Sequence, residues 1–309
     1  MHPLLILGVA GTLLLGGCAT FQPPMQVDHP PSTVASKPFA SGKVPVALVL
    51  SGGSARGFAH VGVIKVLEQN GLRPDIIVGT SAGSIVGALY ASGLTAAELE
   101  TAVAKMDNSV FNDFVLPGLG FLPGEMGFVR GEKLHRFVDG HLKTHHIEDF
   151  PIRFAAVATD LSTGDVAAFN AGDAGLAVVA SSAVPGVITP VIIDRRYYGD
   201  GQIASPLPIG TARALGAKIV VAVDVVYPPQ DAFLYSAVSV LFQTFAVSGH
   251  RLKEFEKASA DLVVTPAIRK TPGQFTYADR QHLIAAGEQA AMEMLPAIRE
   301  SFSNAAVTR

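Results

Sequence analysis

Early in the chain, a short apolar segment twice runs into a glycine-rich turn and then into a helical pattern. The first such segment is Pro45–Leu50, and the second is Asp75–Val78. Apolar runs of this length, without polar alternation, indicate strands that are buried on both faces. Because each strand leads directly into a helix, the sequence predicts an α/β fold with a mainly parallel central sheet and helices on both faces.

The rest of the chain continues this alternation. Thr95, with Glu98 three residues later, has the spacing of a capping box and marks the start of a helix. The pattern therefore predicts a three-layer α/β/α arrangement. Helices are expected over Phe58–Asn70, Ser84–Ser92, Thr95–Lys105 and Tyr277–Ser301, and further strands over Arg153–Thr159, Val166–Phe169, Val187–Tyr198, Ile219–Val226 and Leu262–Thr265.

Composition excludes several classes of protein. With 49% hydrophobic residues and a net charge of −3 over 309 residues, most of the chain has the apolar content of a folded domain. The same charge argues against a nucleic-acid partner, since such binders are normally basic. One cysteine cannot form an internal disulfide.

The first residues have the composition of a targeting segment. Leu4–Gly17 is apolar and uncharged, which is short for a bilayer span but suits the core of a signal peptide. The segment ends in Leu15-Gly16-Gly17-Cys18, which resembles a bacterial lipobox. We therefore expect residues 1–17 to be a signal peptide and Cys18 to carry acyl chains. A secretory signal with an incidental cysteine is the alternative, because Met1-His2-Pro3 contains no Lys or Arg.

The segment that follows has the composition of a linker. Five prolines lie between Ala19 and Lys43, so residues 18–43 are predicted to form a flexible tether before a domain spanning 44–309. Ala19, rather than Asp, follows the cysteine. By resemblance to bacterial lipoproteins, this favours the outer membrane. The expected location is the bacterial cell envelope, facing the periplasm, with the membrane contacted through the lipid anchor.

Three glycine-containing segments carry candidate chemistry. The first is Gly79-Thr80-Ser81-Ala82-Gly83, between a predicted strand and a predicted helix, which is the context of a G-x-S-x-G nucleophile elbow. Gly79 and Gly83 allow the chain to bend tightly around Ser81. A serine at a helix N-terminus is also well placed to develop negative charge. Ser81 is therefore the candidate nucleophile.

The second segment runs from Gly52 to Gly57 and also joins a strand to a helix. Successive backbone N–H groups in such a loop form a concavity that binds anions. A nucleotide phosphate loop is disfavoured, because the Gly-Lys-Ser/Thr ending is absent. An oxyanion hole is the better interpretation, with Arg56 bracing the loop or pairing with a substrate phosphate. The candidate residues are Gly52, Gly53, Ser54, Arg56 and Gly57.

The third segment is Tyr198-Gly199-Asp200-Gly201-Gln202, in which an acid lies between glycines after a strand. Alone, this pattern is typical of a plain turn. In their order, however, the three segments resemble the patatin-like phospholipase family. The resemblance covers residues 46–226 and includes His60-Val61-Gly62-Val63, Ala158-Thr159-Asp160-Leu161-Ser162-Thr163-Gly164 and Ala180-Ser181-Ser182-Ala183-Val184-Pro185-Gly186.

The resemblance implies a three-layer α/β/α acyl hydrolase that uses a Ser–Asp dyad without a cofactor, a metal or a catalytic histidine. Ser81 matches the nucleophile, Asp200 matches the acid, and the amides of Gly53 and Ser54 match the oxyanion hole. Two positions depart from the family pattern. Ser54 replaces a glycine, and Gln202 follows Asp200-Gly201 where a smaller residue is common. A free aspartate is a weak base, so Asp200 is expected to be substantially buried.

Histidines and apolar segments give further expectations. His60 is expected to support the glycine-rich loop, with a role in a Ser–His site as the alternative. His145-His146 is expected to lie in a solvated loop rather than in a metal site. The apolar residues of Val110–Phe128 suit a lid or an acyl-chain groove, or else a cover for the core. Core packing is favoured for Phe233–Val247.

The sequence thus predicts a hydrolase of acyl esters in phospholipids or lysophospholipids, acting at a membrane surface. A broader carboxylesterase or thioesterase using the same dyad is the first alternative. A non-catalytic, membrane-tethered interaction protein is the second.

Overall fold

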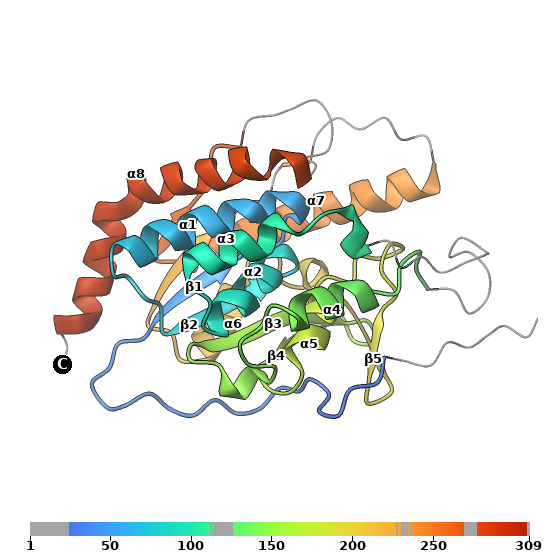
Figure 1. Ribbon diagram of the computed structural model, residues 1–309, viewed down its shortest axis with the longest axis horizontal. Coiled ribbons are helices and arrows are strands. Elements are labelled where there is room, and N and C mark those ends of the chain that lie inside the picture. Colours follow the sequence, from blue (N-terminus) through green and yellow to red (C-terminus); the bar gives the residue numbers. More distant parts are fainter. Residues whose placement is uncertain are drawn as a thin grey trace, which may run out of the picture.

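The computed structural model describes residues 25–111, 113, 126–226, 228–229, 234, 236–268 and 277–307. Within these residues, one eight-stranded sheet has the order β5-β6-β3-β2-β1-β7-β8, and β4 pairs with β3 outside this path (Figure 1). The strands are β1 (Val46–Leu50), β2 (Ile76–Thr80), β3 (Arg153–Asp160), β4 (Val166–Phe169), β5 (Val191–Ile193), β6 (Arg196–Asp200), β7 (Ile219–Val223) and β8 (Leu262–Val264).

The centre of the sheet is parallel, and one side of it is antiparallel. β1 lies between β2 and β7, and all five residues of β1 are buried. β3 and β8 extend the parallel part, whereas β4 and β6 pair antiparallel to β3. β1 and β7 are apolar throughout, as expected for strands that are covered on both faces. The prediction of a mainly parallel sheet is confirmed.

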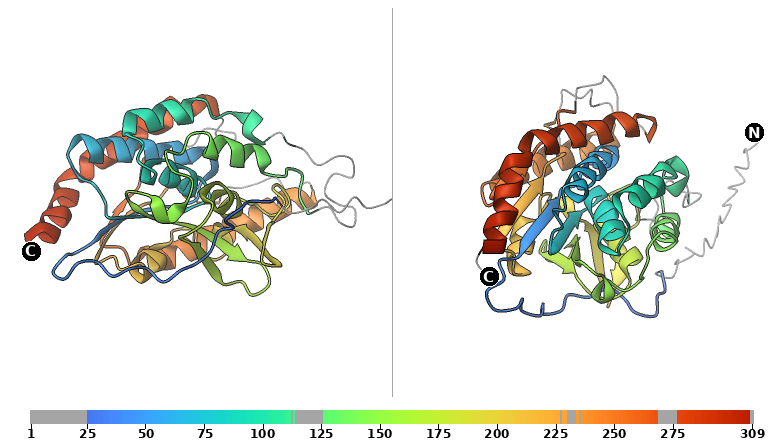
Figure 2. Two further views of the ribbon diagram at one scale, coloured as in Figure 1. Left: turned by 60° about the horizontal axis from the view of Figure 1, so that its bottom comes forward. Right: turned by 60° about the vertical axis from the view of Figure 1, so that its left-hand side comes forward.

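Helices cover the two faces of this sheet unequally. One face, which includes Leu48, Ile77 and Phe154, belongs to the larger core cluster. There the sheet packs against α1 (Phe58–Gln69), α2 (Ala82–Ala91), α5 (Ala174–Ser181) and α8 (Arg280–Val307). The alternate residues of the same strands, such as Val49 and Val78, form a smaller cluster with α6 (Ile209–Ala214). The right-hand view of Figure 2 shows α8 lying along α1 on the outside of the molecule.

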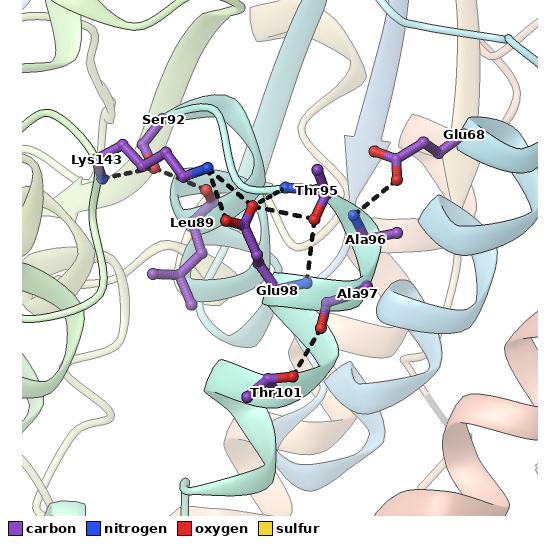
Figure 3. A network of polar contacts seen from close by, with 9 residues as sticks. All are labelled: Glu68, Leu89, Ser92, Thr95, Ala96, Ala97, Glu98, Thr101 and Lys143. Carbon is purple, nitrogen blue, oxygen red and sulfur yellow. Dashed lines mark hydrogen bonds and ion pairs between the residues drawn. The ribbon is translucent and has the colours of Figure 1, made fainter.

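The capping box predicted at Thr95 is present at the start of α3 (Ala96–Ala104). The Thr95 side chain accepts a hydrogen bond from the Glu98 amide, and the Glu98 carboxylate accepts one from the Thr95 amide (Figure 3). Lys143 donates to both carboxylate oxygens of Glu98, and Glu68 of α1 accepts from the Ala96 amide. These contacts satisfy amides that have no partner within the helix.

Two sequence predictions about individual elements are wrong. Val187–Tyr198 is not one strand but contains the β5–β6 hairpin, whose turn residues Asp194 and Arg195 have φ values of 49° and 65°. The described part of Phe233–Val247 is not core, because α7 (Ala237–Lys257) presents several of its apolar side chains to solvent, and Phe233 itself lies outside the described residues. The helices α4 (Glu132–Asp139), α5, α6 and α7 were not predicted.

Part of the predicted tether lies against the domain. Thr33 donates to the Ala168 carbonyl, and the Val34 amide donates to the Asn170 side chain, so this segment follows the edge of the sheet at β4. Phe39 packs on the smaller core cluster, with the Arg153 guanidinium 3.9 Å from its ring centre. This portion of residues 18–43 is therefore bound rather than free. Residues 1–17 and Cys18 lie outside the described residues.

Candidate active site

Ser81 occupies a sharp turn between β2 and α2. Its backbone has a φ of 53° and a ψ of −122°, a conformation that non-glycine residues rarely adopt. The turn is possible because Gly79 lies against the backbone of Gly83, which in turn lies against the Leu50 carbonyl. A Cβ at either glycine would collide with backbone atoms. This strained turn between a strand and a helix is the geometry of a nucleophile elbow.

A second serine fixes the backbone of this elbow. The Ser81 amide donates to the Ser181 hydroxyl at 2.9 Å, and that hydroxyl donates to the Val157 carbonyl of β3 at 2.6 Å. Ser181 is fully buried at the end of α5. In the sequence, Ser181 belongs to one of the family-like motifs, but the pattern alone gives it no role. The structure gives it one, which is to tie the elbow to β3.

Asp200 ends β6, and both of its backbone polar groups are held. Its amide donates to the Ala183 carbonyl, and its carbonyl accepts from the Thr159 hydroxyl at 2.9 Å. The side chain is 1% exposed. Oδ1 accepts from the Gln202 amide at 2.8 Å, whereas Oδ2 is buried without a hydrogen-bond partner among the described residues. One carboxylate oxygen is thus anchored, and the other is uncommitted.

Burial dominates the protonation of this carboxyl group. It raises the pKa of Asp200 from 3.8 to about 7, while the Gln202 amide and the Ser81 hydroxyl act in the opposite direction. The Ser81 hydroxyl is near enough to lower the pKa of Asp200, although Oδ2 has no hydrogen-bond partner among the described residues. An aspartate with a pKa near neutrality is a far better proton acceptor than one with the ordinary value.

The glycine-rich loop lies beside Ser81. A Cβ placed on Gly52 would be 3.5 Å from the Ser81 Cβ and 3.0 Å from Gln202 Oε1. The Gly52 amide is already used, because it donates to the Pro206 carbonyl. The amides of Gly53 and Ser54 donate to no described backbone or side-chain acceptor. These two amides are therefore available as donors, and so is the Ala55 amide, for which no described acceptor exists either.

The remaining loop residues shape the turn. Ser54 has a φ of 52°, in the left-handed region where a glycine would be unstrained. The Arg56 amide donates to the Gly53 carbonyl and so closes the short turn Ser54–Gly57. Gly57 lies directly against Ala82, where a Cβ would meet the Ala82 Cβ at 2.5 Å. The loop is thereby pressed against the start of α2.

A cavity of about 640 Å³ opens in front of these groups. The glycine-rich loop, Ser81 and Gln202 form its polar end. Its other walls are mainly apolar and come from α2, α3, the segment before β5 and α7. They include Ile85, Val86, Val103, Met106, Phe111, Val184, Val187, Ile188, Phe242 and Phe245. This size and lining suit a ligand with a long hydrocarbon portion. Phe121 and Leu122, central to the predicted lid, lie outside the described residues.

His60 is a supporting residue of the loop. It is fully buried in α1, and Nε2 lies 2.9 Å from the Ser51 carbonyl, which identifies Nε2 as the protonated nitrogen. Burial lowers the pKa of His60 to about 4, so the ring is neutral at physiological pH. Elsewhere, Nδ1 of His145 pairs with Asp139 on the surface. The expectation that His60 supports the loop agrees with these contacts.

The raised pKa of Asp200 predicts a pH-dependent stability difference. The unfolded chain releases this proton near pH 4, but the folded chain keeps it until about pH 7. The stabilising contribution is therefore complete below pH 4 and lost as the pH rises through 7. Asp200→Asn cannot ionise, so it does not lose this contribution. The unfolding free energy of the variant minus that of the wild type should therefore be up to about 4 kcal/mol larger at pH 8 than at pH 4.

Urea unfolding at pH 4, 6 and 8 measures this difference. Glu256 also has a pKa raised to about 7 by burial, and its contribution is common to both proteins, so it cancels. Asp165→Asn, at an aspartate that is exposed to solvent, provides a matched control that should show no such trend. An Asp200→Asn difference that is the same at all three pH values would contradict a buried, protonated carboxyl group.

Comparisons with known proteins show which family the chain resembles. A model of the patatin-like phospholipase family matches residues 48–213. An uncharacterized NTE family protein of Mycobacterium tuberculosis is 35% identical over 194 residues, which are 63% of this chain and 52% of that protein. Lysophospholipase NTE1 of Coccidioides immitis is 34% identical over 180 residues, covering 58% of this chain and 11% of that protein.

A solved structure, full-length ExoU in complex with SpcU from Pseudomonas aeruginosa, aligns with a TM-score of 0.47 at 16% identity, over 89% of this chain and 60% of that one. The matches to the sequence relatives cover about half the length of the mycobacterial protein and a small part of the fungal one. The matched region begins within β1, contains the glycine-rich loop and Ser81, and extends beyond Asp200. On this match, which covers more than half of its length, the chain belongs to the patatin-like phospholipase family.

Proposed function

We propose that this protein is a serine acyl hydrolase in which Ser81 is the nucleophile and Asp200 is the general base and acid. The observation that carries the proposal is the buried Asp200 carboxyl group, with its pKa raised to about 7, beside a strained Ser81. The two groups lie where an apolar cavity of about 640 Å³ reaches the glycine-rich loop. A base with this pKa is half ionised at neutral pH and needs no histidine relay.

The chemistry follows from the positions of the donors. The Ser81 oxygen attacks the ester carbonyl carbon, and its proton passes to Asp200. The negative charge that develops on the carbonyl oxygen is stabilised by the Gly53 and Ser54 amides and by the N-terminus of α2. The tetrahedral intermediate expels the alcohol, which takes the proton from Asp200, and leaves acyl-Ser81. Water then transfers a proton to Asp200 and attacks the acyl carbon. The second tetrahedral intermediate expels the Ser81 oxygen, which takes that proton back from Asp200, and the fatty acid is released.

Acyl esters of phospholipids or lysophospholipids are the proposed substrates. Support comes from the apolar walls of the cavity and from a relative that is named a lysophospholipase. A broader carboxylesterase or thioesterase using the same dyad is the second candidate, because the cavity walls supply no described cation except Arg56 to select a phosphate. A non-catalytic role is disfavoured, since Ser81 and Asp200 are both retained in this geometry.

Product analysis distinguishes these candidates. Purified protein is incubated with mixed phospholipid and lysophospholipid vesicles, and in parallel with soluble acyl esters and thioesters. Release of fatty acid from the lipids, at a rate well above that from soluble esters, supports the first candidate. Fluorophosphonate labelling that maps to Ser81, and disappears in Ser81→Ala, supports either enzyme. An unlabelled but folded protein would contradict both.

We also propose that the protein is lipid-anchored in the bacterial cell envelope, at the outer membrane facing the periplasm. The support is the lipobox-like Leu15-Gly16-Gly17-Cys18. Two or more acyl chains would give stable anchoring where a single chain would not. In the described part of the chain, no helix has the length and apolar character needed to cross a membrane.

Cys18→Ser is expected to move most of the protein from the membrane fraction to the soluble fraction, because the acylated thiol is lost. Immunoblotting of fractionated cells measures this, and mass spectrometry of the wild-type N-terminus identifies the acyl chains. Ala19→Asp is the matched control, since it should keep the anchor and alter only which membrane carries it. A Cys18→Ser variant that remains wholly in the membrane fraction would place the anchor elsewhere.

A further inference from the structure

The outward face of α7 is apolar where a surface helix is normally charged. Val240, Leu241 and Val247 are 47%, 43% and 39% exposed. With Thr244 and Ser248, which are also exposed, they follow the i, i+1, i+4, i+7, i+8 spacing of a single helix face. These five residues are called the α7 face below. No charged residue occurs anywhere between Ala237 and Gly249.

The second half of α7 has the opposite character. Five of the seven residues in Arg251–Lys257 are charged. Lys253 is buried, donates to the Val226 carbonyl and pairs with Asp224 beyond the end of β7. Glu256 accepts hydrogen bonds from the Ser205 hydroxyl and the Leu207 amide. Charged contacts thus fix the C-terminal half of the helix to the domain. The α7 face stays largely exposed, and Leu241 touches Gly186 in the segment before β5.

The same part of α7 also borders the cavity. Phe242, Phe245 and Ala246 line the cavity, so the helix separates the cavity interior from the α7 face on its outside. Gly249 lies against the side chain of Gln202, which places this part of the helix within contact of the residue that follows Asp200-Gly201. In Figure 1, α7 extends along one flank of the molecule to its end. The α7 face therefore lies at the boundary of the candidate active site.

We infer that the α7 face docks on the surface of a lipid bilayer and delivers acyl chains to the cavity. The order of apolar, hydroxyl and basic side chains along this side of α7 favours a lipid bilayer as the occupant. The apolar side chains match the hydrocarbon region, the Thr244 and Ser248 hydroxyls suit the interface, and exposed Arg251, one turn further on the same side, suits lipid phosphates. The inference rests on the proposed function for the identity of the substrate, but the contact with lipid is measurable without turnover.

The absence of tryptophan from the chain permits a site-specific test. Leu241→Trp places a single fluorophore on the α7 face, and Met292→Trp places one on α8, where Met292 is 63% exposed on an element that packs on α1. Both are made in full-length Ser81→Ala protein, so that vesicles are not consumed. Phosphatidylcholine vesicles with brominated acyl chains should blue-shift and quench the emission of the Leu241→Trp protein but not that of the Met292→Trp protein. Equal quenching, or none in either protein, would overturn the inference.

A second copy of the chain is the competing occupant of the α7 face. If a second copy covers this face, the emission of the Leu241→Trp protein should already be blue-shifted without vesicles. The shift should then depend on protein concentration, and brominated lipid should not quench the emission. That result would overturn lipid docking. Salt gives a further distinction, because docking carried by apolar side chains should persist at about 0.5 M salt, whereas binding through phosphate contacts alone should not.

Activity provides the second arm, in otherwise wild-type protein. Leu241→Glu with Val247→Glu should lower vesicle hydrolysis by about tenfold or more, since two apolar side chains would no longer enter the bilayer. Turnover of a soluble short-chain ester should remain within about twofold. Met292→Glu is the matched control and should change neither. Loss of both activities would overturn the docking role. If wild-type protein hydrolyses no ester while brominated lipid quenches the Leu241→Trp protein, the proposed function fails and the docking stands.

Discussion

Replacing Ser81 by alanine is expected to lower turnover of a soluble short-chain ester by at least about 10³-fold, and Asp200→Asn should have an effect of similar size. The first change removes the proposed nucleophile. The second removes the proposed base while nearly preserving its shape and the contact with the Gln202 amide. Because the two groups act as one unit, the double variant should be little worse than either single variant. Initial rates, normalised to folded protein, measure all three.

The wild-type pH profile belongs to the same experiment. Since the active form of Asp200 is ionised and its pKa is about 7, kcat/KM should fall about tenfold per pH unit below pH 7 and level off above it. His60→Gln is the matched control, because glutamine can still donate to the Ser51 carbonyl at the position of His60. If folded His60→Gln is as inactive as Ser81→Ala while Asp200→Asn retains substantial activity, a Ser–His site replaces the dyad.

Gly53→Pro should cost at least about 10²-fold in activity, because it deletes one of the two amides proposed for the oxyanion hole. Ser54→Gly, in contrast, keeps its amide and should leave activity within about tenfold. It also relieves a backbone held at a φ of 52°, so its melting temperature should equal or exceed that of the wild type. Rates on the soluble ester and thermal melts, measured on the same samples, test both statements.

Steric effects at Gly53 need their own control. A Cβ there would lie 2.7 Å from Val225 Cγ2, so any substitution crowds this side chain. Gly53→Ala combined with Val225→Ala introduces the Cβ, removes its closest contact and keeps the amide, with the Val225 carbonyl oxygen 3.2 Å from the new Cβ. If this pair is as inactive as Gly53→Pro although it is folded, crowding rather than donor loss explains the effect. Small and equal effects at Gly53 and Ser54 would mean that the oxyanion hole lies elsewhere.

The elements that could be predicted from sequence are those with a strong local signal. β1 and β2 are short apolar runs between breakers, and the capping box at Thr95 places the start of α3 within one residue. The elbow at Ser81 and the loop at Gly53 depend on glycine positions that local sterics dictate. The burial of Asp200 followed from a chemical requirement, since an exposed aspartate would be too weak a base.

The features that could not be predicted depend on tertiary contacts. Asp194 and Arg195 both adopt positive φ without a glycine, so the β5–β6 turn had no recognisable signature. The apolar residues around Phe242 were expected in the core because hydrophobicity alone does not distinguish a buried helix from an exposed apolar face. The role of Ser181 is visible only once α5 is placed against β2 and β3.

The pairing of β3 has a consequence for how this scaffold can diversify. Thr80, next to Ser81, lies opposite Val157 of β3. Asp200 lies opposite Ala158, the next residue of β3, so two adjacent residues of this strand fix the backbone positions on either side of it. Their separation is set by two inter-strand spacings of about 4.8 Å each, a property of backbone hydrogen bonding that side-chain changes do not alter. Surrounding segments can therefore change length and composition, and with them the molecules that gain entry, while the reactive pair keeps its span.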